Sequence, residues 1–235
     1  MSASSRLVVA VNIFAAPGEA FRAIKERPRF FLPLLVTIVG AVVATWLYLA
    51  EVDIAWLVEQ QLRTVRFLNM SDEQITQTAA QAAARGRTFL LVQGIASTCI
   101  AIVVVQLLIA LYLKIVVAIA KDGVSYHQLF GLVCWTGLPS VLTSVATIVF
   151  LLTNDVSFLS QTAINPVSFR NLLGLDVEGA NALVRIGANL GPINLWTIAL
   201  MILGYRALSG RGVVFSSVVV LAPIIFVIGL IVALI

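Results

Sequence analysis

The stretch that decides the fold is Gly94–Ala120, which reads GIASTCIAIVVVQLLIALYLKIVVAIA. It contains a single charged residue, Lys114, and consists mainly of Ile, Val, Leu and Ala. A helix rises about 1.5 Å per residue, so this run is longer than a hydrocarbon core of roughly 30 Å. The pattern predicts a membrane-spanning helix that tilts or projects beyond the lipid.

Apolar runs of the same kind occur elsewhere in the chain, at residues 33–50, 129–152, 190–208 and 213–235. Backbone groups in lipid must be paired inside the protein, which leaves helices or a closed barrel. Continuous apolar runs lack the alternation of a barrel strand. The sequence therefore predicts an all-α polytopic membrane protein with five transmembrane helices.

The composition agrees with a membrane protein. Hydrophobic residues make up 60% of the chain and charged residues 11%, against about 45–50% and roughly 25% in soluble domains. The formal net charge is +4, and the basic residues lie beside apolar runs. Anionic headgroups attract basic residues in that position, so membrane lipids are expected partners and nucleic acid is not. Cys99 and Cys134 lie inside apolar runs and are expected to be small buried hydrophobes.

Two longer polar segments separate the runs. In residues 51–87, Ser71 followed by Gln74 predicts a capping box at the start of a helix. The sequence leaves open whether this helix continues into the second apolar run. Residues 153–189 contain Asn165-Pro166 and several glycines, which predict a loop with one or two short helices.

Residues 1–32 are expected to form a cytoplasmic segment ahead of one membrane domain, residues 33–235. Residues 17–28, PGEAFRAIKERP, predict a short amphipathic helix on the membrane surface, with a plain cytoplasmic linker as the alternative. We expect the segment to be retained rather than cleaved as a signal peptide. The candidates for contact with lipid or a partner are Phe21, Arg22, Ile24, Lys25 and Arg27.

Lys and Arg near the ends of spans predict the orientation. Five precede the first run, Lys121 follows the second, and Arg206 and Arg211 follow the fourth. The two long loops hold six basic residues, together with eight of the eleven acids. This bias predicts a cytoplasmic N-terminus and an external C-terminus.

Polar residues inside the membrane are candidate functional residues. Lys114 is expected to extend its amine toward the inner surface, with a buried ion pair or a transport role as the alternative. Gln106 is expected to bond between helices. The intramembrane candidates for packing or function are Lys114, Pro139, Asn189, Asn194 and Trp196.

Several kinds of chemistry have no matching residues in the sequence. His127 is the single histidine, and the apolar runs hold no pair of acids. A multi-histidine metal site or a paired-carboxylate protease would need these residues. No phosphate-binding glycine motif is present. We expect no enzyme activity, cofactor or metal.

Three motifs resemble the Yip family of Ypt-interacting-protein-like membrane proteins, in its bacterial form. They are the opening Pro17–Pro28, the turn Lys121–Ser125 with Pro139 after it, and the run Pro192–Gly204 with Trp196 inside it. Asn194 stands where an Asp is common in the family. The resemblance implies five spans, a cytoplasmic N-terminus and a bacterial inner membrane. Eukaryotic members carry a long cytoplasmic N-terminal region and act in vesicle trafficking with Rab-type GTPases.

The leading functional hypothesis is a non-enzymatic scaffold or adaptor that binds other membrane proteins, or itself, or shapes the bilayer. The alternative is a small transporter or channel subunit, suggested by Lys114, Gln106, Asn189, Asn194 and the break at Pro139, because broken helices mark binding sites in many transporters.

Overall fold

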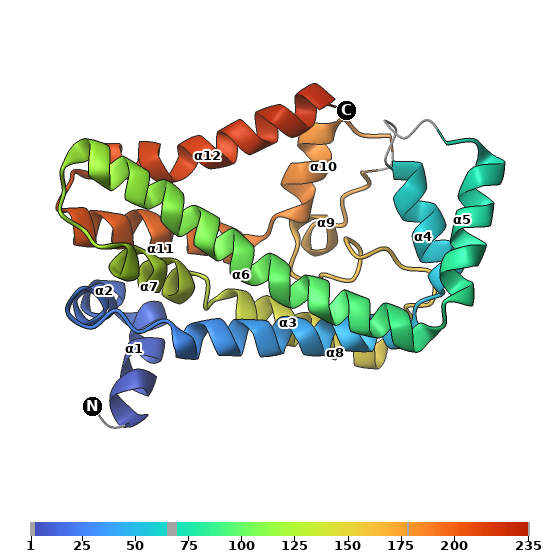
Figure 1. Cartoon of the computed structure of the whole chain (residues 1–235), viewed down its shortest axis with the longest axis horizontal. Coiled ribbons are helices and arrows are strands. Elements are labelled where there is room, and N and C mark those ends of the chain that lie inside the picture. Colours follow the sequence, from blue (N-terminus) through green and yellow to red (C-terminus); the bar gives the residue numbers. More distant parts are fainter. Residues whose placement is uncertain (1–2, 65–69, 178, 235) are drawn as a thin grey trace.

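The structure is a computed structural model that describes residues 3–64, 70–177 and 179–234. Its regular elements are helices (Figure 1). Three positions counted above lie outside the described residues: Arg66 among the basic residues of the long loops, Glu178 among their acids, and Ile235 at the expected end of the last span.

The long helices are α3 (Phe31–Glu51), α6 (Arg87–Ala120), α11 (Pro192–Ser209) and α12 (Val213–Leu234). A further path is formed by α7 (Tyr126–Thr136) followed by α8 (Ser140–Thr153). These helices run along the long axis of the molecule, and successive ones run in opposite directions (Figure 1).

Four helical stretches are long and apolar enough to cross a bilayer: α3, α6, α7 with α8, and α12. The fifth crossing depends on α11, which meets the same criteria when it is joined to α10 (Ala182–Asn189) across a bend of 83°. The all-α membrane fold is confirmed, with four to five candidate spans.

The second span begins at Arg87, earlier than the expected start at residue 94. Before it, α5 (Asp72–Ala84) ends at Arg85, and Gly86 has a φ of +85°. Residues other than glycine rarely adopt this backbone conformation, which is not helical, so α5 ends before Gly86. The polar helix therefore does not continue into the span.

The third span is divided, as Pro139 suggested. The first half ends at Thr136, and Pro139 stands at the N-cap of α8. Proline has no backbone N–H to donate to the preceding turn, so a helix restarts at it more easily than it continues through it.

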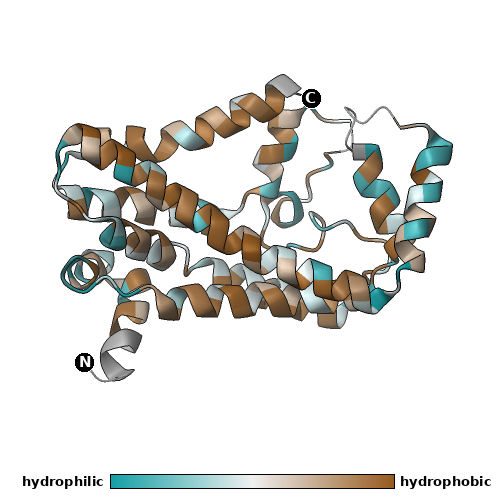
Figure 2. Cartoon of the chain, in the orientation of Figure 1, coloured by the Kyte–Doolittle hydropathy of each residue, from teal (hydrophilic) through white to brown (hydrophobic). Residues whose placement is uncertain are grey.

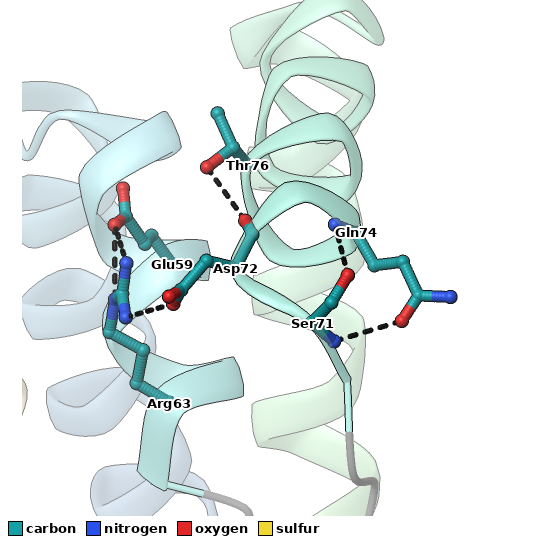
Figure 3. Close-up of polar contacts among 6 residues, drawn as sticks. All are labelled: Glu59, Arg63, Ser71, Asp72, Gln74 and Thr76. Atoms are coloured by element: carbon teal, nitrogen blue, oxygen red, sulfur yellow. Dashed lines mark hydrogen bonds and ion pairs between the residues drawn. The ribbon is translucent and has the colours of Figure 1, made fainter.

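Beyond α3, α4 (Ile54–Thr64) and α5 pack on each other as a hairpin at the far end of the molecule (Figure 1). Figure 3 shows the predicted capping box, in which Ser71 Oγ accepts from Gln74 N and Gln74 Oε1 accepts from Ser71 N. Arg63 joins the two helices by ion pairs to Glu59 (2.8 Å) and Asp72 (2.7 Å).

Two buried clusters hold the bundle together. The larger combines α2 (Pro17–Glu26) with parts of α6, α7, α11 and α12, and with Ile13 of α1 (Ala3–Ala15). The smaller joins the end of α3 to α4 and to residues 151–164. The segment 154–191 contains the short helices α9 (Phe169–Leu172) and α10, as the sequence predicted.

The outer surfaces of the long helices are apolar, and the hairpin and connecting turns are more hydrophilic (Figure 2). The exposed apolar residues of α6 extend along its length and include Val92, Ile100, Leu108, Leu111, Ile115 and Ile119. An exposed surface of this kind suits a hydrocarbon environment.

Candidate membrane-interface site

The helix predicted at the membrane surface is present as α2. Pro17 occupies its first turn, where a missing N–H has no cost. Phe21 and Ile24 lie one turn apart, and each is 1% exposed within the larger buried cluster. Both are candidates for contact with lipid or a partner, and in the structure the apolar face of α2 packs against the protein's own helices.

Hydrogen bonds fix the end of α2 on its neighbours. Gln128 Nε2 of α7 donates to Lys25 O over 2.8 Å, and Trp135 Nε1 donates to Arg29 O over 2.6 Å. Lys25 Nζ donates to Ala207 O, near the end of α11, over 3.4 Å. These contacts hold α2 against both α7 and α11.

The polar face of α2 stays open. Arg22, Lys25 and Arg27 are exposed. They lie at the same end of the molecule as the turn between α6 and α7 and the turn between α11 and α12 (Figure 1). The basic side chains expected at the interface are therefore grouped at one end of the bundle, where the spans begin and end.

An ion pair that the sequence did not reveal joins the two turns at this end. Arg211 Nη2 lies 2.6 Å from Asp122 Oδ1, and the Asp122 side chain is 5% exposed. Arg211 also donates to Ala120 O, the last residue of α6, over 2.5 Å. The hydrogen bond that Arg211 donates to the Asp122 carboxylate raises the pKa of the Arg211 guanidinium, which stays charged.

Lys114 and Gln106 bond within the protein. Lys114 Nζ donates to Val124 O over 2.9 Å, so its amine reaches the turn after α6. Gln106 is 9% exposed, and its Oε1 accepts from Cys134 Sγ of α7 over 2.9 Å. Lys114 thus extends toward the end of its helix, and Gln106 links two helices.

The other intramembrane candidates lie at two places in the fold. Pro139 is buried at the start of α8. Asn194 Oδ1 accepts from Gly191 N over 2.9 Å and so caps α11. Asn189 Oδ1 is buried without a hydrogen-bond partner among the described residues. Trp196 is 39% exposed and belongs to neither buried cluster. Asn189, Asn194 and Trp196 thus lie at the junction of α10 and α11, and Pro139 stands at the start of α8.

The positioning of α2 also depends on a glycine. A Cβ built at Gly204 of α11 would lie 2.2 Å from Leu132 Cδ1 and 2.9 Å from Phe21 Cε1. Glycine therefore lets α11 approach both α2 and α7 closely. In the described ranges, no group of three or more His, Cys, Asp or Glu side chains is arranged to hold a metal ion.

The helical bundle, with a basic amphipathic helix packed across one end, defines a polytopic integral membrane protein. The chain belongs to the Yip1 domain family, whose family model matches residues 11–234. No match was found among curated proteins or among solved structures.

Proposed function

We propose that the protein is a non-enzymatic membrane scaffold or adaptor that binds other membrane proteins, or further copies of itself, or shapes the bilayer. The observation that carries this proposal is that the polar side chains within the bundle bond to the protein itself. Lys114 and Gln106 bond inside the protein, whereas the surface of α6 presents apolar side chains along its length. Such a surface suits packing against lipid or partner helices.

The exposed basic residues in and just after α2 would supply the contact at the inner surface. Arg22, Lys25 and Arg27 stand beside the spans, and anionic lipids of the cytoplasmic leaflet attract such groups. We place the N-terminus in the cytoplasm and the C-terminus outside, in a bacterial inner membrane. For a cell with internal membranes, the corresponding proposal is a role in membrane trafficking.

The test is crosslinking in native membranes, followed by affinity purification and mass spectrometry. We expect a reproducible partner or a homo-oligomer in stoichiometric amount. Tryptophan at Ile100 and Leu108 would obstruct the face of α6, and tryptophan at Val39 and Val43 of α3 is the matched control. All four positions are exposed and apolar. Recovery of neither a partner nor an oligomer would contradict the proposal.

Transport is the second candidate function. The break before Pro139 and the 83° bend between α10 and α11 favour it, since interrupted helices mark binding sites in many transporters. Flux measured in proteoliposomes separates the two. A flux that is abolished by Lys114→Ala would favour transport. Proteoliposomes that contain the wild-type protein and show no flux would favour the scaffold.

A further inference from the structure

An open pocket of about 610 Å³ lies between α2 and the end of α11. Its walls come from the first turns of α2, the last turns of α11 and the connection to α12. Three arginines, three apolar side chains and three glycines line it: Arg22, Arg206, Arg211, Phe21, Leu203, Ala207, Gly18, Gly210 and Gly212.

Two of these arginines have guanidinium groups available to a ligand. Arg22 and Arg206 are exposed, and neither guanidinium forms a hydrogen bond or an ion pair with another described residue. Arg211 is held by Asp122 and Ala120 and serves as a fixed wall. The described residues that line the pocket include no acid. The pocket therefore offers positive charge that the protein does not neutralise.

The remaining surface of the pocket is apolar and open. Leu203 and Ala207 are exposed and supply hydrocarbon surface beside the arginines. A Cβ built at Gly18 or Gly212 would meet nothing within 4 Å. The pocket thus combines a charged part with an apolar part and has room for a group between them.

The pocket lies where two long helices meet a turn. Ser209 ends α11 and Val213 begins α12, so the lining residues Gly210–Gly212 belong to the level of the lipid headgroups. The last carbonyls of α11 would repel an anion, but those of the lining residues Arg206 and Ala207 accept hydrogen bonds. Gly210 N donates to Arg206 O over 2.9 Å, and Lys25 Nζ donates to Ala207 O over 3.4 Å.

We infer that this pocket binds the phosphate of an anionic phospholipid. Arg22 and Arg206 hold the phosphate oxygens, because a guanidinium presents paired donors that match them. Leu203 and Ala207, which are exposed, contact the glycerol and the first acyl carbons. The inference gives the proposed scaffold a lipid partner, and it rests on that proposal in placing this end of the bundle at a membrane surface.

The test uses the full chain in nanodiscs of phosphatidylcholine, with or without phosphatidylglycerol, and counts retained lipid by native mass spectrometry. A charge-assisted hydrogen bond from a guanidinium to a phosphate is worth about tenfold or more in affinity, and this effect is specific to the pocket. We expect Arg22→Gln with Arg206→Gln to weaken phosphatidylglycerol retention roughly a hundredfold.

The matched control is Arg29→Gln with Lys121→Gln. Both residues are exposed, lie at the same end of the molecule and lie outside the pocket. Their substitution removes the same amount of charge as the test variant does. We expect lipid retention by this control to change by less than about twofold. An equal loss in both double variants would overturn the pocket, because surface charge alone would then explain binding.

A second variant fills the pocket without changing its charge. Gly18→Phe places a ring in open space on α2 and keeps both arginines. We expect phosphatidylglycerol retention to fall with an unchanged Tm. Retention equal to that of the wild type would overturn the inference.

Free phosphate carries the same chemistry as the lipid and must be separated from it. Inorganic phosphate and glycerol 3-phosphate in excess are expected to leave phosphatidylglycerol bound, because neither reaches the apolar wall. Displacement by inorganic phosphate would overturn the assignment to a lipid. The wild-type protein could retain the lipid here while the crosslinking experiment recovers no partner. That result would support the lipid pocket and contradict the scaffold proposal.

Discussion

Gly204 shows how one missing side chain sets the distance between helices. Its position on α11 faces Leu132 of α7 and the ring of Phe21 of α2, and all three lie in buried surroundings. The neighbouring side chains have little room to move, since each is packed in the larger cluster. The close approach of α2 to the bundle therefore depends on the absence of a Cβ here.

We expect Gly204→Val to destabilise the protein by about 1–3 kcal/mol, the usual cost of overpacking a core. Gly229→Val is the matched control, because a Cβ at that position of α12 meets nothing within 4 Å. Both variants add the same β-branched residue to a helix. Thermal unfolding in detergent measures the difference, and equal Tm values would contradict the packing described here.

Arg211 and Asp122 should behave as a unit. Arg211→Gln leaves a carboxylate that is 5% exposed without its ion-pair partner, which is unfavourable for a buried charge. We expect Arg211→Gln to lower the Tm more than the double variant with Asp122→Asn does. If the double variant has the lower Tm, the carboxylate is not the source of the loss.

The sequence identified which residues of α2 share a face, but it did not show that this face packs against the protein's own helices. Phe21 and Ile24 are one turn apart whether they meet lipid or another helix, since both environments favour apolar side chains. The burial of these residues depends on Gly204, which is far away in the chain. The Arg211–Asp122 pair was missed for the same reason, because it requires knowing that the two turns are neighbours.

At the scale of helices, Gly86 separates a polar helix from a membrane-spanning one. Its φ of +85° lies in a region that other residues reach only with strain. We expect Gly86→Ala to destabilise the protein by about 1–3 kcal/mol. Gly187→Ala in α10 is the control, since that glycine has an ordinary φ and open space around it. Chemical unfolding would measure both, and a neutral Gly86→Ala variant would contradict the strain.

The sequence predicted the position of a helix well where a run of apolar residues alone marks it. The first and last spans begin within two residues of the expected positions 33 and 213. The extra turns of α6 were missed because residues 87–93, RTFLLVQ, mix polar and apolar residues. Lys114 reaches the turn at Val124, as expected of a lysine near a helix end. Whether Lys114, Pro139, Asn189, Asn194 and Trp196 have any functional role remains a prediction.

At the scale of the whole molecule, the two ends of the bundle should lie on opposite sides of a membrane. Lys121 belongs to the turn after α6 and Gln161 to the segment after α8, and both are exposed. We expect Gln161→Cys to react with an impermeant thiol reagent on intact cells, and Lys121→Cys only after permeabilisation. Cys99→Ala and Cys134→Ala provide the background.

Two outcomes of this labelling would contradict the proposal. Reaction of both positions from the same side would exclude the alternating path of the spans. Reaction of Lys121→Cys alone on intact cells would reverse the orientation. The charge bias that predicts orientation is a property of the sequence, and no feature of the folded chain by itself distinguishes inside from outside.

The packing of α2 on α11 has a consequence for biosynthesis. Lys25 and Ala207, which bond across this contact, are separated by 182 positions in the chain. The buried apolar side chains Val219 and Val220 lie in the early turns of α12 and join the same cluster. The first helices to leave the ribosome must therefore wait for the last spans to be inserted. During that interval Phe21 and Ile24 have no protein partner, and the bilayer surface is the place where an amphipathic α2 can shelter them.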